Sequence, residues 1–387
     1  MMEPVILANS KFSIDLLKVL CKATAGNVLF SPLSISSALG LVLLGAMRDP
    51  AKHEPPNPTA DQMFKALHFG KMRIMYHYLY EELYKEGEYK TKDKKRSLQL
   101  VNRMFGEKTV TFYDNFLDEC EEWCFASLRN ADFKTDPDAA RKKINSWVEN
   151  KTYHQLKDLL DPGDVSKDTS LALISAVYFK KKWATGFEPD TNKDKGVDWP
   201  MMGKTDYLPL GTIPHRQYQL PAEAQILEIP YENHDLSMLI ILPNKSDALP
   251  KLVDSITYAK IMEWTEPDNM IPTDVEVIMP MFTLKEKYDL EKALKALGII
   301  DLFSDKCDLS GMAPGKLKLS KVVHKSVVEV DKEGTDAQAG GGGVVQTDGK
   351  EISELFTVQS PFLFFIRHNP TKSIVFWGRV ISPEPVI

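Results

Sequence analysis

The sequence contains little cysteine and has no excess of positive charge. Its 387 residues include four cysteines, too few for a disulfide scaffold, so we expect reduced, buried thiols. Lysine and arginine number 48 against 54 aspartates and glutamates, which gives a net charge of −6. Binding to nucleic acid or to an anionic membrane depends on positive charge, so we expect neither partner.

Long apolar runs are also missing. The N-terminal apolar character ends at Ala8, where Asn9, Ser10 and Lys11 follow, so no secretory signal is predicted. The most apolar stretch, 33–47, contains three serines and is shorter than the roughly 20 residues that span a bilayer. We therefore expect a buried helix there, in a protein that is cytoplasmic or released without a conventional signal peptide.

The common catalytic and ligand-binding signatures are absent too. The sequence has no GxSxG nucleophile elbow and no HExxH zinc motif. Gly203, Lys204 and Thr205 resemble the end of a phosphate loop, but Asp198 stands where its first glycine should be. The eight histidines are scattered, and the cysteines have no further metal ligands nearby. An enzyme is therefore unsupported, and we predict no metal and no cofactor.

Helical periodicity dominates the first 160 residues, and strand-like segments dominate the rest. Helices are predicted at 72–84, 116–128 and 139–160. β-Branched and aromatic residues predict strands at 171–179, 225–230, 236–242, 275–282, 322–330, 362–366 and 374–380. No Gly/Ser linker and no repeat separates the halves, so the sequence predicts one large α+β domain over residues 1–387.

A basic run interrupts this pattern at residues 90–96. Its basic residues are Lys90, Lys92, Lys94, Lys95 and Arg96. Such a run is ordinarily a solvated loop face, and the alternatives are a glycosaminoglycan site or a nuclear-import patch.

About 30 residues with few large apolar side chains separate the predicted strands 322–330 and 362–366. Loops longer than about 12–15 residues are uncommon in compact domains and tend to be functional or disordered. Alternate positions here are small or uncharged: Thr335, Ala337, Ala339, Gly341, Gly343 and Val345. Asp336 belongs to the other set, so a strand formed by this segment would have one small, uncharged face. The alternative is a flexible Gly/Ala loop that never becomes a strand.

Several segments resemble the serpin family. VDKEGTDAQA at 330–339 is similar to the family's hinge, and NVLFSPLSISSALGLVLLGA at 27–46 to its buried strand and helix. ALISAVYFKKKWATGF at 172–187 resembles the central strand and the tryptophan after it, and 319–331 resembles the strand leading to the hinge. PFLFFIRHNPTKSIVFWGRVISP at 361–383 is similar to the closing hairpin of the intracellular, ovalbumin-like branch. The resemblance implies a serpin fold with three β-sheets, about nine helices and an exposed reactive-centre loop at about 332–360.

By this resemblance the chain is predicted to be no enzyme but a monomeric, metastable inhibitor of serine endopeptidases, with cysteine endopeptidases as a further target class. In the family, the target endopeptidase attacks the loop and forms a covalent acyl complex, and the freed loop then enters the main sheet. The alternative is a non-inhibitory serpin, a chaperone, storage or binding protein whose loop is cleaved without trapping.

The resemblance also assigns roles to individual residues. The hinge comprises Lys332, Glu333, Gly334, Thr335, Asp336, Ala337, Gln338 and Ala339, and Lys332 stands where a glutamate is usual. The sheet-opening cluster comprises Ser31, Ser34, Ser175, Trp183 and His324, and Ser175 replaces an expected asparagine.

Two scissile bonds are compatible with the family's spacings. Counting from the hinge gives Asp348-Gly349, which suits an aspartate-directed protease of the caspase or granzyme type. Counting back from Pro361 gives Lys350-Glu351 and a trypsin-like target. We favour Asp348-Gly349, because hinge length controls how tautly the protease is pulled and because an acid after Lys350 makes a poor trypsin site.

Overall fold

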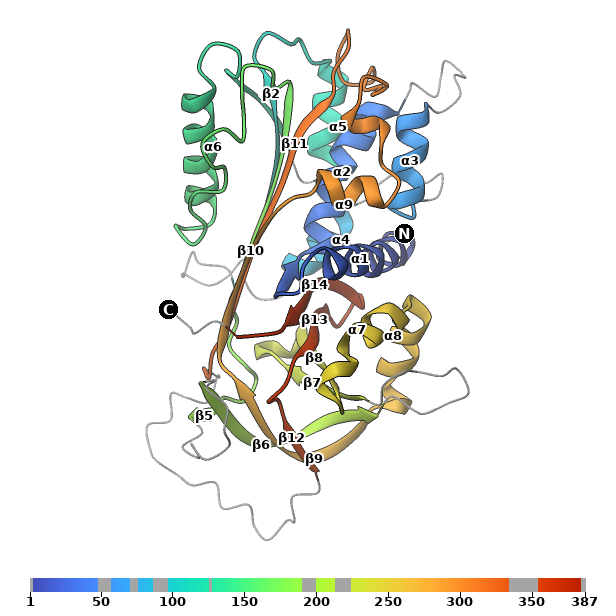
Figure 1. Ribbon diagram of the computed structural model, residues 1–387, viewed down its shortest axis with the longest axis vertical. Coiled ribbons are helices and arrows are strands. Elements are labelled where there is room, and N and C mark those ends of the chain that lie inside the picture. The colour runs from blue at the N-terminus through green and yellow to red at the C-terminus, as the bar shows by residue number, and fades with distance from the viewer. Residues whose placement is uncertain are drawn as a thin grey trace. The chain divides into compact units, whose positions relative to one another are not determined.

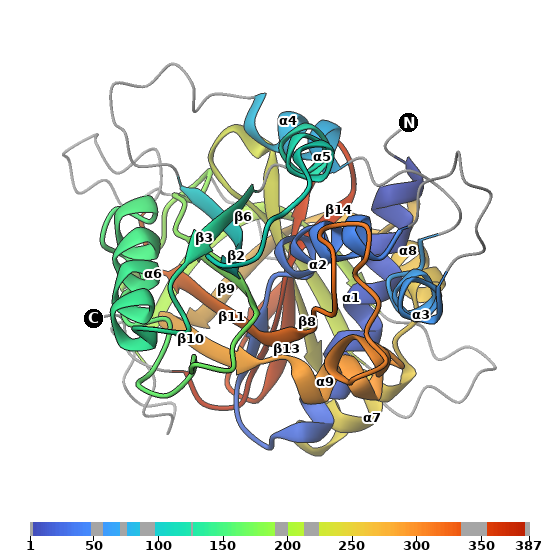
Figure 2. The same ribbon diagram turned by 90° about the horizontal axis from the view of Figure 1, so that it is seen from above.

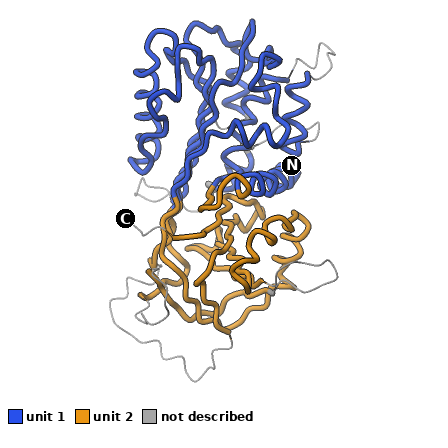
Figure 3. The backbone as a smooth tube through the Cα atoms, in the orientation of Figure 1, with its two compact units in different colours: residues 1–20, 30–179, 285–327 blue, residues 21–29, 180–284, 328–387 orange. Residues whose placement is uncertain are grey.

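The computed structural model describes residues 3–47, 57–69, 76–85, 97–124, 127–189, 200–212, 224–333 and 354–383. The chain divides into two compact units, coloured separately in Figure 3. Unit 1 comprises Met1–Leu20, Phe30–Phe179 and Lys285–Val327, and unit 2 comprises Cys21–Leu29, Lys180–Leu284 and Val328–Ile387. The single-domain interpretation of residues 1–387 stays a prediction.

The described residues form nine α-helices, as expected. Most lie in unit 1: α1 (Glu3–Ala23), α2 (Pro32–Ala46), α3 (Pro58–Ala66), α4 (Tyr76–Lys85), α5 (Asp114–Cys124), α6 (Pro137–Lys151) and α9 (Glu291–Ala296). The last three residues of α1, after Leu20, are assigned to unit 2. Unit 2 contains α7 (Leu249–Ser255) and α8 (Tyr258–Thr265). Side-chain caps set where the helices begin. Ser31 Oγ accepts from Ser34 N–H before α2, and Asp136 accepts from Ala139 N–H before α6.

A five-stranded sheet has the order β10-β11-β4-β2-β3. Its strands are β10 (Phe282–Asp289), β11 (Leu319–Val330), β4 (Leu171–Phe179), β2 (Leu98–Glu107) and β3 (Ser127–Ala131). All nine residues of β4 are buried. The two faces of β4 are covered by different helices, because Ile174 packs in one core with Ile144 of α6, whereas Ser175 contacts Ser34 of α2. Figures 1 and 2 show α6 and α2 in these positions.

The second sheet has nine strands. Its order is β1-β14-β13-β8-β7-β6-β9-β12, with β5 beside β6. The strands are β1 (Val28–Phe30), β14 (Ser373–Val380), β13 (Phe362–His368), β8 (Leu236–Pro243), β7 (Ala224–Pro230), β6 (Met201–Thr212), β9 (Ile271–Pro280), β12 (Glu354–Thr357) and β5 (Glu188–Pro189). β6 and β7 pair over only three residues, from Leu210 to Thr212. This short junction divides the nine-stranded sheet into one part from β1 to β7 and another that contains β5, β6, β9 and β12. These two parts and the five-stranded sheet correspond to the three expected sheets.

Three predicted elements have the wrong bounds. The helix predicted at 139–160 ends at Lys151, because Tyr153, His154 and Asp158 have left-handed backbones with φ of 49°, 65° and 49°. The helix predicted at 116–128 ends at Cys124, and Leu128 pairs in β3 with Met104 of β2. The strand predicted at 275–282 is interrupted at Met281, which lies between β9 and β10.

Candidate functional site

Four of the five predicted sheet-opening residues meet in unit 1, around the neighbouring strands β4 and β11. Ser170 N–H donates to Ser320 Oγ at 3.0 Å, and Ser175 Oγ lies 2.8 Å from His324 Nδ1. The residue numbers rise together along the two strands, so β4 and β11 are parallel. They are hydrogen-bonded neighbours, and no described strand separates them.

Ser31, Ser34, Asn102, Ser175 and His324 form a continuous hydrogen-bond chain, which we call the buried chain. A backbone N–H can only donate, so His324 Nε2 accepts from Ser31 N–H at 3.1 Å. At the other end Ser34 donates to Asn102 Oδ1 at 2.9 Å, so Ser34 Oγ accepts from Ser175, also at 2.9 Å. The Ser175 hydroxyl must then accept from His324 Nδ1–H. The bonds at both ends of the buried chain therefore assign His324 the same neutral tautomer, with its proton on Nδ1.

The buried chain holds His324 uncharged. His324 is fully buried, and burial lowers its pKa to about 3. A second proton would sit on Nε2 and face the Ser31 N–H, which is also a donor. The single hydroxyl of Ser175 both donates and accepts, which is how a serine at this position completes the chain.

Asn102 belongs to this site although the sequence did not single it out. Its amide donates to Ser34 O at 3.0 Å and to Ser37 Oγ at 2.9 Å, and Ser37 Oγ lies 2.6 Å from Tyr80 OH. Asn102 pairs with Ser175 across β2 and β4. Its position depends on the register of a strand that the sequence pattern did not predict.

Trp183, the fifth predicted residue of the cluster, lies in unit 2 and contacts the hinge. Its N–H donates to Glu333 O at 2.9 Å, and its indole Nε1–H donates to Asp331 O at 2.7 Å. Phe187 N–H donates to Lys332 O at 2.9 Å. Three consecutive carbonyl groups at the start of the hinge are therefore bound by the segment after β4. We call this arrangement the hinge clamp: Lys180, Trp183 and Phe187 against residues 329–333.

Aromatic packing fixes the indole of the hinge clamp. Trp183 is 1% exposed and stacks on Tyr231, with ring centroids 4.4 Å apart and planes inclined by 9°. The Phe187 ring meets Trp183 edge-on at 5.5 Å. Buried indole N–H groups require a hydrogen-bond partner, and the Asp331 carbonyl provides it.

Lys180 adds charge to the hinge clamp. Its Nζ lies 3.0 Å from Asp331 Oδ2 and 3.2 Å from Glu329 Oε2. Burial lowers the pKa of Lys180, but its hydrogen bonds and charge interactions with these two carboxylates outweigh burial and raise the pKa above its usual value. The side chain of Lys332 is exposed, so its positive charge is not desolvated.

Several predicted site residues lie outside the described residues. They are the hinge positions Gly334, Thr335, Asp336, Ala337, Gln338 and Ala339, both candidate scissile bonds Asp348-Gly349 and Lys350-Glu351, and the basic residues Lys90, Lys92, Lys94, Lys95 and Arg96. Their assignments stay predictions.

The described cysteines correct the expectation of uniformly buried thiols. Cys21, Cys120 and Cys307 are free thiols; Cys120 is buried and the other two are half-buried. Burial raises the pKa of Cys120 to about 12 and that of Cys21 and Cys307 to about 11, so these three thiols are protonated at neutral pH.

In the described ranges, no group of three His, Cys, Asp or Glu residues is placed to hold a metal ion. Nor does any described helix combine the length and hydropathy of a membrane span.

Comparison with known proteins gives a consistent result. The family model described as "Serpin (serine protease inhibitor)" matches residues 7–383. The chain is 38% identical to Serpin B4 of Homo sapiens over 400 residues, covering 97% of this chain and 98% of that protein. It is 40% identical to leukocyte elastase inhibitor of Bos taurus over 398 residues, covering 99% and 100%. The solved structure of uncleaved ovalbumin is 29% identical, with a TM-score of 0.83, and the match covers 98% of this chain and 100% of that one.

Proposed function

Because this chain belongs to the serpin family, we propose that it inhibits serine endopeptidases by trapping them as acyl-enzymes while residues 335–347 enter the sheet between β4 and β11. Its relatives include ovalbumin-like serpins, and leukocyte elastase inhibitor is named as a protease inhibitor. The observation that carries the proposal is that the place for an inserted strand is closed in the intact protein. β4 and β11 are direct neighbours, and the hinge clamp binds the carbonyl groups of residues 331–333.

Strand direction supports this insertion. A strand that follows β11 through a tight turn runs antiparallel to β11, and therefore antiparallel to β4 as well. If Thr335 pairs with Val330, the residue opposite His324 is Gly341. Residues opposite one another in an antiparallel pair point to the same face of the sheet. The small set that includes Thr335, Ala337 and Gly341 would then face the buried chain, and Gly341 has no side chain to disturb it.

The expected energetics favour insertion. The four glycines at 340–343 cost roughly 0.5–1 kcal/mol each relative to alanine in a strand, or about 2–4 kcal/mol together. Roughly twelve new backbone hydrogen bonds contribute about 0.5–1.5 kcal/mol each, or about 6–18 kcal/mol. Thirteen inserted residues at about 3.3 Å each would carry the attached protease roughly 40 Å.

The target class depends on the scissile bond. We propose Asp348-Gly349 and an aspartate-directed endopeptidase, serine or cysteine, of the granzyme or caspase type. Lys350-Glu351 with a trypsin-like enzyme is the alternative. We further propose that the inhibitor acts as a monomer in the cytoplasm, or outside the cell after release without a conventional signal peptide.

A protease panel tests trapping and the scissile bond together. The protein is incubated with granzyme-type, caspase-type and trypsin-like enzymes and then analysed by denaturing electrophoresis and mass spectrometry. We expect a covalent band with the summed mass of inhibitor and protease, and a released C-terminal peptide that begins at Gly349. A peptide that begins at Glu351 would identify the trypsin-like alternative.

The non-inhibitory function makes a different prediction in the same experiment. Complete cleavage by every enzyme without a covalent band would assign the chain to the chaperone, storage or binding class. Polyanion regulation through Lys90–Arg96 is a separate proposal. Retention on a heparin column that salt elutes, and that is lost when the five basic residues are replaced by glutamine, would support it.

A further inference from the structure

The segment that connects α6 to β4, residues 152–170, carries two adjacent carboxylates on a tight turn. We call this segment the strap. Asp161, Pro162, Gly163 and Asp164 form the turn, in which Asp164 N–H donates to Asp161 O at 3.0 Å and Gly163 has φ of 91°. Asp161 N–H in return donates to Asp164 Oδ2 at 2.7 Å. The turn therefore places both carboxylates side by side.

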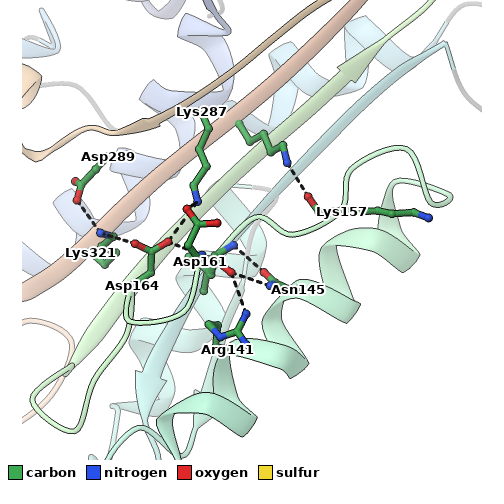
Figure 4. Close-up of polar contacts among 10 residues, drawn as sticks. Arg141, Asn145, Lys157, Asp161, Asp164, Lys287, Asp289 and Lys321 are labelled. Carbon is green, nitrogen blue, oxygen red and sulfur yellow. Dashed lines mark hydrogen bonds and ion pairs between the residues drawn. The ribbon is translucent and has the colours of Figure 1, made fainter. Parts of the chain in front are cut away.

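Ion pairs connect this turn to β10 and β11 (Figure 4). Lys287 Nζ of β10 lies 2.6 Å from Asp161 Oδ2 and 3.3 Å from Asp164 Oδ2. Lys321 Nζ of β11 lies 3.0 Å from Asp164 Oδ1, and it also contacts Asp289 at 2.8 Å. The Asp164 and Lys321 side chains are each 18% exposed. The pair of Asp164 and Lys321 is therefore partly desolvated and stronger than a fully exposed pair, whereas the Asp161 side chain is 69% exposed, and all of these pairs are accessible to salt.

Asp164 is ionised at neutral pH. Its burial raises the pKa, but the hydrogen bonds from Asp161 N–H and Lys321, with the charges of Lys321 and Lys287, lower it more, so the pKa lies below its usual value.

The strap is attached differently to α6. Asn145 donates from Nδ2 to Leu160 O at 2.9 Å and accepts from Leu160 N–H at 2.8 Å, and Arg141 donates to the same carbonyl at 3.2 Å. The buried side chains Leu156, Leu159, Leu160 and Val165 pack in one core with α6 and the sheet. On the side of α6, therefore, the strap is held by these bonds and this packing, and also by contacts of Glu149 with His154 at 3.0 Å and Lys157 at 3.8 Å.

The strap is also continuous with β4, which begins one residue after it at Leu171. When β4 and β11 separate, the strap must stay with one of them. Its covalent link to β4 cannot break. The contacts that must break are those to β10 and β11: the ion pairs, the bond from Lys325 Nζ to Lys157 O at 2.6 Å, the bond from Ser170 N–H to Ser320 Oγ, and the packing of the strap in one core with Val323 and Val327 of β11.

We propose that the ion pairs of Asp161 and Asp164 with Lys287 and Lys321 form an electrostatic clasp that limits how fast β4 and β11 separate. Ionic strength then sets the rate at which the sheet accepts a new strand. This inference rests on the proposed function, because sheet opening serves the protein only if a strand enters. The clasp is distinct from the buried chain, which is uncharged and fully shielded from salt.

Strand annealing measures opening without any protease. A fluorescent synthetic peptide with the sequence of residues 335–347 is added to the intact protein, and its incorporation is followed by native electrophoresis. The test variant is Asp161→Asn/Asp164→Asn. The control is Asp168→Asn, which removes one negative charge, where the test variant removes two, from an exposed strap residue for which no ion pair is described.

At about 0.1 M NaCl we expect the test variant to incorporate the peptide about three- to tenfold faster than the wild type and the control. Raising NaCl to about 1 M should accelerate the wild type and the control but leave the test variant unchanged. Lys287→Gln removes contacts to both carboxylates from the strand side, and it should show an intermediate rate. It replaces the double variant if that protein does not fold.

Two negative outcomes are distinguishable. Equal incorporation rates and equal salt dependence in all variants would overturn the clasp and leave the proposed function intact. No incorporation into any variant, together with no gain in melting temperature after cleavage within 334–353, would overturn the proposed function and the clasp with it.

Discussion

The buried chain of unit 1 and the hinge clamp of unit 2 include residues of the same strand, β11, but they use opposite chemistry. The buried chain is neutral and consists of bonds between side chains apart from the Ser31 backbone N–H that donates to His324, and Ser31, Ser34, Ser175 and His324 are each at most 2% exposed. The hinge clamp is charged and partly exposed, and three of its bonds end on backbone carbonyls.

This difference bears on the two positions, Lys332 and Ser175, at which the family resemblance predicts another residue. The clamp uses only the carbonyl group of Lys332, so the identity of that exposed side chain is unconstrained by the clamp. The buried chain uses the hydroxyl of Ser175 as donor and acceptor, so only a side chain with both capacities completes it. Substitutions should therefore lower stability strongly in the buried chain and only slightly at the exposed side chain of Lys332.

The largest effect is expected from a substitution that leaves both sites intact and blocks the insertion that they control. Ala337→Glu would place a carboxylate on the face that enters the sheet, where an unpaired charge costs several kcal/mol. We expect the stoichiometry of inhibition, measured by titration of the target protease, to rise at least about tenfold.

The control is Lys332→Glu, which places a carboxylate at an exposed hinge residue that lies before the inserting residues 335–347. Its stoichiometry should change far less. Equal stoichiometries for both variants and the wild type would contradict the insertion register.

The second effect compares the two sites directly. His324→Leu leaves the Ser31 N–H without its acceptor and removes the donor to the Ser175 hydroxyl in a buried site, so the free energy of unfolding should fall by about 2–4 kcal/mol. Lys332→Glu changes an exposed side chain and should alter it by less than about 0.5 kcal/mol. Urea unfolding measures both, and similar losses would refute the distinction between the two sites.

The third prediction is that the two sites contribute to stability with different pH dependences. The pKa of His324 is lowered to about 3 in the folded protein, while an unfolded histidine titrates near 6.5, so the unfolded state binds more protons between these values. Stability should therefore fall as the pH drops below about 6.5, with a slope of up to about 1.4 kcal/mol per pH unit from His324.

Lys180 gives the opposite dependence. Its pKa is raised in the folded protein, so its contribution is fully present below the unfolded value and is lost as the pH rises through the folded value. Urea midpoints across pH should lose the acid slope in His324→Gln and the smaller alkaline change in Lys180→Met. If the pH dependence of the urea midpoint persists in both variants, titratable groups other than His324 and Lys180 dominate it.

A smaller effect than that of His324→Leu is expected from Trp183→Phe. The variant keeps an aromatic ring against Tyr231 but removes the hydrogen bond from Nε1–H to Asp331 O. Loss of one hydrogen bond should lower the unfolding free energy by about 1 kcal/mol and accelerate peptide annealing modestly. A loss of unfolding free energy as large as that of His324→Leu would show that the hinge clamp and the buried chain contribute equally to stability, which contradicts the distinction between them.

Much of the fold could be predicted because continuous buried segments are recognisable. β4, β13 and β14 were found within two residues at each end, since their β-branched and aromatic runs are buried throughout. β2 was missed because Asn102 and Arg103 interrupt its apolar pattern, and these residues are polar for reasons that arise only in the fold. Asn102 completes the buried chain, and the Arg103 guanidinium lies 4.1 Å from the Trp147 ring.

The candidate site was predictable only where the family resemblance reached it. Ser31, Ser34, Ser175 and His324 are joined by hydrogen bonds, and their role in sheet opening stays a prediction. Asn102, Lys180 and Phe187 were not found, because their partners are distant in sequence and are set by strand register or by backbone carbonyls. The strap was taken for a helical extension because Leu156, Leu159 and Leu160 have helical spacing, although they pack a non-helical segment into the core.

The central claim is that the intact protein is kinetically held above a more stable form, which cutting the loop makes accessible. The most direct measurement is the melting temperature of the intact protein against that of the same protein nicked once within residues 334–353, with both fragments retained. A markedly higher melting temperature for the nicked protein is the predicted result. An equal or lower value would contradict the account.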